Sequence, residues 1–188
     1  GSGNNFWVAV GQDSIASSSD AISWTGRGVG IFNTYSCSVA CGKDGSNNNF
    51  WVAVGQNTVS GNNIATSVDG ITWTGRKSNS FDTGVGVAYG KDGSGNGLWV
   101  AVGRGGPSTR ISTSSDGITW TGRNGGFTYY EGGYSVAYGN GLWVAVGNGA
   151  NTIYTSPDGI TWTVRTNVFT TGTGHDVTYA NGLWVATG

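Results

Sequence analysis

Short apolar segments recur along the chain at nearly constant spacing. Each reads Phe-Trp-Val-Ala-Val-Gly or a close variant, with apolar residues at both odd and even positions, as in strands covered on both faces. The tryptophans of the five segments are Trp7, Trp51, Trp99, Trp143 and Trp184. Their spacings of 44, 48, 44 and 41 residues indicate that one structural unit is repeated about four times.

A second repeated segment, Ile-Thr-Trp-Thr-Gly-Arg with small variations, follows each apolar segment except the last. It contains Trp24, Trp73, Trp120 and Trp162, so all nine tryptophans belong to the repeat. An Asp-Gly pair precedes this segment in three copies, while the first copy reads Asp20-Ala21. Asp-Gly between two extended runs predicts a two-residue hairpin turn, because such turns need positive φ.

A third segment lies directly before each later apolar segment and is marked by Val39, Val87, Val136 and Val177. Asn-Gly at 140–141 and 181–182 predicts two further hairpins, so each repeat contains four short strands joined by turns. Four antiparallel strands in 41 to 48 residues are typical of a β-propeller blade. We therefore predict an all-β fold, a single β-propeller domain over residues 4–188.

Ring closure is the open question of this prediction. Seventeen strands are expected, and the series begins and ends with the second strand of a blade. We predict a monomeric ring of four blades, in which residues 175–180 pair with the N-terminal Phe-Trp-Val-Ala-Val-Gly segment and the final Leu-Trp-Val-Ala-Thr-Gly is spare or replaces it. The alternatives are five blades with incomplete end blades, and a homo-oligomer that closes the ring by strand exchange.

The Asp-Gly turns resemble those of the Asp-box, or BNR, propellers. That family has the pattern Ser-x-Asp-x-Gly-x-Thr-Trp, and Ser114, Asp116, Gly117, Thr119 and Trp120 match it in kind. One residue between Asp and Gly is missing here, so the turn is tighter than the family's. The resemblance recurs four times over nearly the whole chain and implies the propeller fold. Asp-boxes mark a fold and carry no activity.

Composition narrows the class of protein and its partners. The chain has 36 glycines and 10% charged residues, against roughly 25% in an average domain, and its aromatic and β-branched residues exclude an all-α fold. A net charge of −1 without a basic cluster argues against nucleic acid as a partner. No apolar run is long enough for membrane insertion. Residues 1–3, Gly-Ser-Gly, resemble a remnant of cloning. The composition favours an extracellular or virion surface, and an engineered origin stays open beside a natural one.

No metal or cofactor is predicted. Cys37 and Cys41 lie four residues apart in an extended segment, which separates their α-carbons by roughly 13 Å, too far for a disulfide. The only histidine, His175, cannot supply the further ligands that a metal site needs. We interpret both thiols as packing residues.

Catalysis is not predicted either. A sialidase-like site would use Tyr129 or Tyr130 with Glu131 as nucleophile and base, together with arginines from inner strands. The repeated arginines instead end the outer strands, and Glu131 is the only glutamate. A glycosidase would need a second carboxylate, but the repeated aspartates are occupied in turns. We predict that the chain is not an enzyme.

Binding is the function class that the repeat favours. Two sets of variable loops emerge on one face of the expected blades, and one set follows the repeated arginines and contains one Phe in each copy. The candidate ligand-binding residues are Arg27, Phe32, Arg76, Phe81, Arg123, Phe127, Tyr129, Arg165 and Phe169. A packing role stays open for the same residues, in which each Phe fills the joint between blades and each Arg binds loop carbonyls. Aromatic platforms with planar donors suit weak, multivalent sugar binding, as in lectin-like propellers. The alternative is a structural or adhesive module of a virion, tail fibre or cell surface, with a surface protein as its partner.

Overall fold

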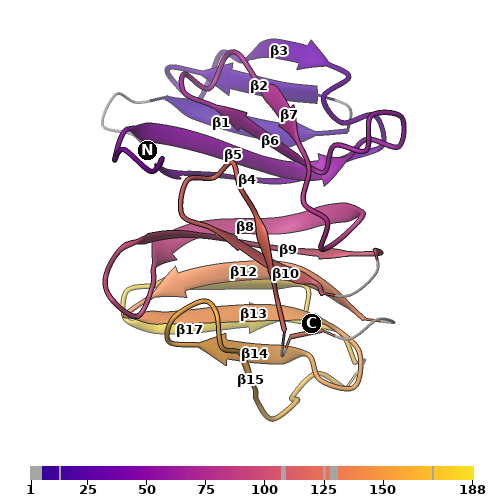
Figure 1. Cartoon of the computed structure of the whole chain (residues 1–188), viewed down its shortest axis with the longest axis vertical. Coiled ribbons are helices and arrows are strands. Elements are labelled where there is room, and N and C mark those ends of the chain that lie inside the picture. Colours follow the sequence, from indigo (N-terminus) through magenta and orange to yellow (C-terminus); the bar gives the residue numbers. More distant parts are fainter. Residues whose placement is uncertain (1–5, 13, 107–108, 125, 128–130, 171) are drawn as a thin grey trace.

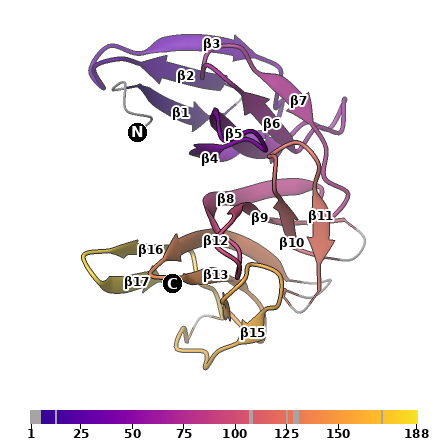
Figure 2. The same cartoon turned by 60° about the vertical axis from the view of Figure 1, so that its left-hand side comes forward.

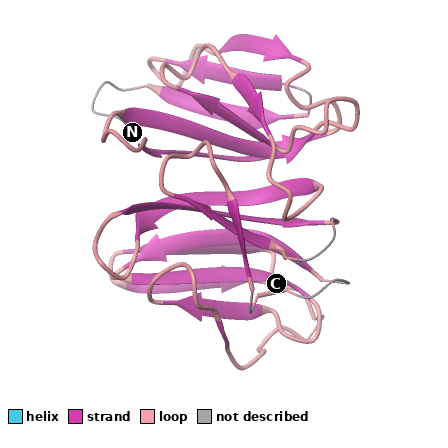
Figure 3. Cartoon of the chain, viewed as in Figure 1, coloured by secondary structure: helices cyan, strands magenta, loops and turns pink. Residues whose placement is uncertain are grey.

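A computed structural model describes residues 6–12, 14–106, 109–124, 126–127, 131–170 and 172–188. The regular structure in these residues consists entirely of β-strands, as predicted (Figure 3). The cloning remnant inferred at residues 1–3 lies outside the described part of the chain.

The strands form five antiparallel sheets that follow the sequence order of the repeats. The first three-stranded sheet contains β1 (Trp7–Gly11), β2 (Ser14–Ser18) and β3 (Thr25–Val29). Three four-stranded sheets follow. The second sheet contains β4 (Tyr35–Lys43), β5 (Asn49–Gln56), β6 (Ile64–Ser67) and β7 (Thr74–Arg76), and the third contains β8 (Thr83–Lys91), β9 (Gly97–Arg104), β10 (Ile111–Ser114) and β11 (Thr121–Arg123). The fourth contains β12 (Gly132–Gly139), β13 (Leu142–Asn148), β14 (Ile153–Ser156) and β15 (Thr163–Val164). The hairpin β16 (Asp176–Ala180) and β17 (Leu183–Thr187) ends the series.

The sheets succeed one another along an open arc that begins with the β1–β3 sheet (Figure 1) and ends with the β16–β17 hairpin (Figure 2). The first strands of successive repeats, β4, β8, β12 and β16, lie next to one another. This is the order of strands and blades that the repeat predicts.

Ring closure differs from the prediction. In the described residues β16 pairs with β17, in register from Asp176 with Thr187 to Ala180 with Leu183, and not with the N-terminal segment. The cause is local: Asn181 and Gly182 both have positive φ, at 52° and 81°, and turn the final segment directly back onto β16. Among the residues that the structure describes, β1 pairs with β2 only.

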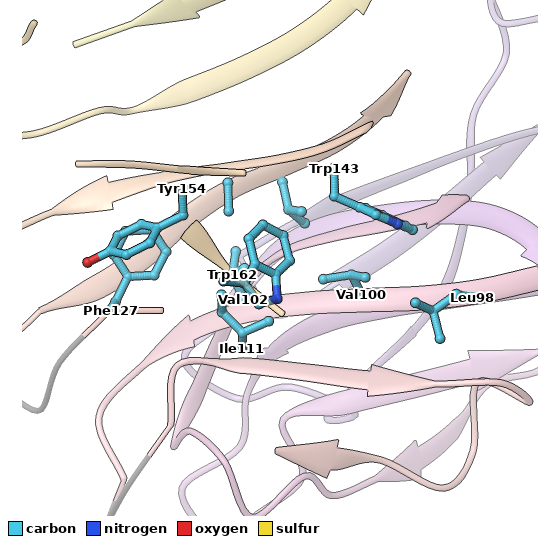
Figure 4. Close-up of a cluster of buried hydrophobic side chains, with 10 residues drawn as sticks. Leu98, Val100, Val102, Ile111, Phe127, Trp143, Tyr154 and Trp162 are labelled. Carbon is cyan, nitrogen blue, oxygen red and sulfur yellow. The ribbon is translucent and has the colours of Figure 1, made fainter. Parts of the chain in front are cut away.

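Apolar residues on both faces of the second strands fill the spaces between sheets. Val52, Val54, Val100 and Val102 have no exposed surface, which agrees with their position between two covering layers. Figure 4 shows one such cluster, where side chains of β9 and β10 meet Trp143, Tyr154 and Trp162 of the next repeat. Burial between sheets, rather than within any single sheet, therefore stabilises the molecule.

Tryptophans of the second strands connect neighbouring sheets through hydrogen bonds. The Trp99 indole N–H donates to the Lys43 carbonyl at 2.8 Å, and the Trp143 indole donates to the Lys91 carbonyl at 2.8 Å. Each acceptor lies at the end of the first strand of the preceding sheet. The bonds fix the register of adjacent sheets, and both indoles are fully buried.

The Asp-Gly turns form as the sequence predicts. In one turn, Asp116 Oδ1 accepts the backbone N–H groups of Ile118 and Thr119, both at 2.8 Å. Gly117 has φ 75°, and Ala21, which replaces the glycine in the first copy, also has a positive φ of 62°. Alanine in this region is strained, because its Cβ approaches the following carbonyl oxygen.

Exchanging glycine and alanine at these turns should shift stability in opposite directions. Ala21→Gly should raise the free energy of unfolding by about 1 kcal/mol by relieving the strained φ. Gly117→Ala should lower it by at least as much, since its Cβ would also lie 2.9 Å from Phe50 Cε1. Thermal unfolding followed by circular dichroism measures both shifts. A lower melting temperature for Ala21→Gly would contradict the assignment.

The same turns predict acid sensitivity. The backbone N–H groups of Thr72 and Ile71 lower the pKa of Asp69 to about 2. Because the folded pKa is depressed, the carboxylate stabilises the fold above its unfolded pKa of about 4, and this contribution is lost as the pH falls toward 2. Denaturant unfolding at several pH values should show lower stability below pH about 4. The Asp69→Asn variant should lose less stability between pH about 5 and 2 than the unmodified chain does.

Candidate functional site

A polar cavity opens at the end of the sheets where the β5–β6 and β7–β8 connections meet. Its volume is about 560 Å³, and both connections belong to the face that the sequence assigned to binding. The lining residues are Gln56, Asn57, Thr58, Gly61, Asn63, Lys77, Ser78, Asn79, Phe81 and Asp82. The cavity therefore combines loops of a single repeat with the entry to the next sheet.

Two buried asparagines hold these loops in place. Asn63 Nδ2 donates to the Phe81 carbonyl at 2.6 Å, and its Oδ1 accepts the Ser78 N–H at 2.7 Å. Asn57 Nδ2 donates to the Gly30 carbonyl at 2.9 Å, which joins the loop to the preceding sheet. Amide side chains with both donor and acceptor satisfied make the cavity largely preformed.

Other polar side chains of the lining are more accessible and differ in kind. Thr58, Lys77, Asn79 and Asp82 are exposed, and Gln56 is half-buried. Together they offer a hydroxyl, an ammonium, two amides and a carboxylate. This mixture of donors and acceptors can bind a neutral ligand that carries several hydroxyl groups.

The repeated arginines occupy equivalent positions and make equivalent bonds. Each Nε–H donates to a hydroxyl on the third strand, ten residues earlier: Arg27 to Ser17, Arg76 to Thr66, Arg123 to Thr113 and Arg165 to Thr155. In the first three copies the bond joins the third strand of the repeat to the fourth. In the last copy Arg165 directly follows the fourth strand, β15. Arg165 is exposed and the other three are half-buried.

Three of the repeated phenylalanines are buried, which agrees with the packing role and not with exposed platforms. Phe32, Phe81 and Phe127 are 1%, 1% and 3% exposed, and they pack beneath the loops between sheets. Phe169 is half-buried. A ring enclosed in the core has no free face for a sugar, so hydrophobic burial accounts for these positions. Tyr129 lies outside the described residues.

In a second hollow, Arg123 lies near Trp162, and Phe127, the aromatic residue that follows Arg123 in the sequence, is not part of the lining. It has a volume of about 430 Å³ and is lined by Gly122, Arg123, Asn124, Ile160, Thr161 and Trp162. The last three belong to the Asp-Gly turn segment of the next sheet. The sequence carries the repeated Arg and Trp, but only the stacking of sheets brings them together.

Glu131, which a sialidase-like site would use, lies directly before β12. Glu131 accepts the Ala150 N–H at 2.9 Å, which gives the carboxylate a role in its loop. In the described residues no three His, Cys, Asp or Glu side chains gather as metal ligands. Nor does any helix long and apolar enough to cross a membrane occur there.

Comparisons with known proteins point to the fold alone. No protein-family model and no curated protein matches the sequence. The structure of YCF48 from Cyanidioschyzon merolae is similar, with a TM-score of 0.57 and 17% identity over 95% of this chain, which spans 61% of that protein. A candidate exo-β-1,3-galactanase from Bifidobacterium bifidum s17 matches with a TM-score of 0.45 and 10% identity, over 85% of this chain and 67% of that one. The likeness to YCF48 and the succession of antiparallel sheets support a β-propeller architecture.

Proposed function

We propose that the chain is a non-catalytic carbohydrate-binding module of the β-propeller class. The observation that carries the proposal is the polar cavity between residues 57–63 and 77–82, with its preformed loops and accessible hydrogen-bonding side chains. We also propose that the four repeats of each chain form four blades.

The chemistry of the cavity fits a neutral glycan better than a charged ligand. Lys77 and Asp82 offset each other in charge, and the amides of Gln56 and Asn79 can each donate and accept. A carboxylate and amides that line one cavity can bind hydroxyl groups of one sugar ring. Such a shallow site binds weakly, so repeated sites would raise the apparent affinity.

A glycan array tests the proposal. The folded 188-residue chain should bind a subset of immobilised glycans, and the free sugar should compete for that binding. Blank arrays with a chain that retains its β-sheet circular dichroism would reject the lectin function.

A blank array would favour the second candidate, a structural or adhesive module that binds protein. The specific observation in its favour is the series of isoleucines on the Asp-Gly turns. Ile71, Ile118 and Ile160 are 41%, 40% and 39% exposed at equivalent positions, and Ile160 lines the second hollow. Repeated exposed apolar side chains suit contact with a protein surface.

A further inference from the structure

The first strands of neighbouring sheets meet through a repeated contact between glycine and tyrosine. Gly42 lies against Tyr89, Gly90 against Tyr138, and Gly139 against Tyr179. A Cβ atom on any of these glycines would overlap the tyrosine ring. Three interfaces along the arc therefore require glycine on one side because tyrosine occupies the other.

At the two ends of the arc, other residues replace the glycine and the tyrosine of this contact. β16 carries Ala180 at the position of the glycines, and β4 carries Cys41 at the position of the tyrosines. The extra methyl group of Ala180 would clash with a tyrosine, whereas the smaller cysteine leaves room for it. If β16 lies beside β4, the smaller side chain of Cys41 compensates for the larger side chain of Ala180.

A second set of equivalent positions on these strands also favours β16 beside β4. Ser135 on β12 donates its hydroxyl to Asp176 Oδ1 on β16 at 2.7 Å. The equivalent residue on β4 is Ser38. With β16 beside β4, Asp176 would face a serine hydroxyl on each side and accept a hydrogen bond from both.

Side chains of the first and second sheets that border the space beside β1 and β4 also lack the partners that their equivalents have. Trp51 on β5 is the equivalent of Trp99 and Trp143, yet in the described residues its indole N–H has no acceptor. The equivalent acceptor would be the carbonyl of Asn181, directly after β16. Trp7 is 52% exposed, whereas Trp99 and Trp143 are fully buried.

We propose that β16 of a second copy of this chain pairs with β1 and completes the first sheet as its first strand, beside β4. The hairpin and the first sheet lie at opposite ends of the arc (Figure 2). Bending one arc until its own ends meet would disturb three interfaces fixed by glycine–tyrosine contacts. A second copy leaves all three unchanged, and exchange in both directions closes a two-chain ring.

In this ring β1 replaces β17 as the partner of β16. Val10 on β1 stands at the position of Val54, Val102 and Val146, which have no exposed surface. β17 has Thr187 at this position, and a buried hydroxyl without a partner is unfavourable. Trp7 would then contact Tyr179, as Trp184 does now at a ring-centroid distance of 4.9 Å.

Engineered disulfide formation tests this arrangement. In the background Cys37→Ser, the variant Ala180→Cys should form a disulfide with Cys41 of the other copy under mild oxidation. Non-reducing gels should then show a band at twice the chain mass of 19.3 kDa, reversed by a reductant. The control that also carries Cys41→Ser should give no such band.

The unmodified chain supplies a second measurement that does not depend on the variant's folding. Light scattering should give twice 19.3 kDa. A monomeric mass, or a disulfide formed only within one chain, would overturn the two-copy ring. A folded Ala180→Cys variant in which Cys41 and the introduced thiol both stay reactive under oxidation would overturn the placement of β16 beside β4.

Discussion

Gly90→Ala should strongly destabilise the chain, by about 1–3 kcal/mol or more in the free energy of unfolding. The new Cβ would overlap the Tyr138 ring, in an interface that lies in the middle of the arc. Urea denaturation followed by tryptophan fluorescence measures the change. Gly26→Ala is the matched control, since a Cβ there meets nothing within 4 Å, and it should change stability by less than about 0.5 kcal/mol.

The double variant Gly90→Ala/Tyr138→Cys introduces, in the middle of the arc, the same combination of residues as Ala180 and Cys41 at its ends. Tyr138→Cys alone removes the contact between Tyr138 and Trp143, whose rings lie 4.8 Å apart. The double variant should nevertheless be more stable than the sum of the two single changes, by a coupling of about 1–2 kcal/mol. Additive effects would show that alanine and cysteine do not compensate for each other.

Trp99→Ala should cause the second large loss, of about 3–5 kcal/mol. The side chain has no exposed surface, its ring lies 4.8 Å from that of Tyr89, and its N–H bonds the Lys43 carbonyl. Its removal creates a cavity between two sheets and leaves a carbonyl without its donor. Denaturant unfolding should show the loss, whereas Val59→Ala, at a position 88% exposed, should be nearly neutral. Equal effects of the two substitutions would contradict the proposed role of the buried indoles.

The repeated elements of the fold could be predicted from the sequence because their signals are local. Asp-Gly and Asn-Gly specify hairpin turns through their backbone preferences, and even Ala21 keeps the positive φ of the glycine that it replaces. The apolar character of the second strands on both faces correctly indicated that sheets cover them on both sides. These features need no knowledge of distant parts of the chain.

Closure and the binding cavity depend on packing between sheets, which the sequence pattern does not specify. The Leu183–Thr187 segment pairs with its nearest neighbour through a tight turn, where we expected the N-terminal segment. Phe81 was a candidate ligand platform because one Phe recurs in each loop that follows a repeated arginine, yet its side chain is buried. Asn57 and Asn63 were missed because their role is to bond backbone groups of other segments.

Calorimetric titration with a glycan selected on the array would test the proposed binding site most directly. Lys77→Ala and Asp82→Ala, which alter the cavity, should each weaken binding at least about tenfold, a loss of about 1.4 kcal/mol. Lys91→Ala removes the same charge outside the cavity lining and should bind like the unmodified chain. Unchanged affinity in both cavity variants, with saturable binding in all four proteins, would contradict the assignment of the glycan site to this cavity.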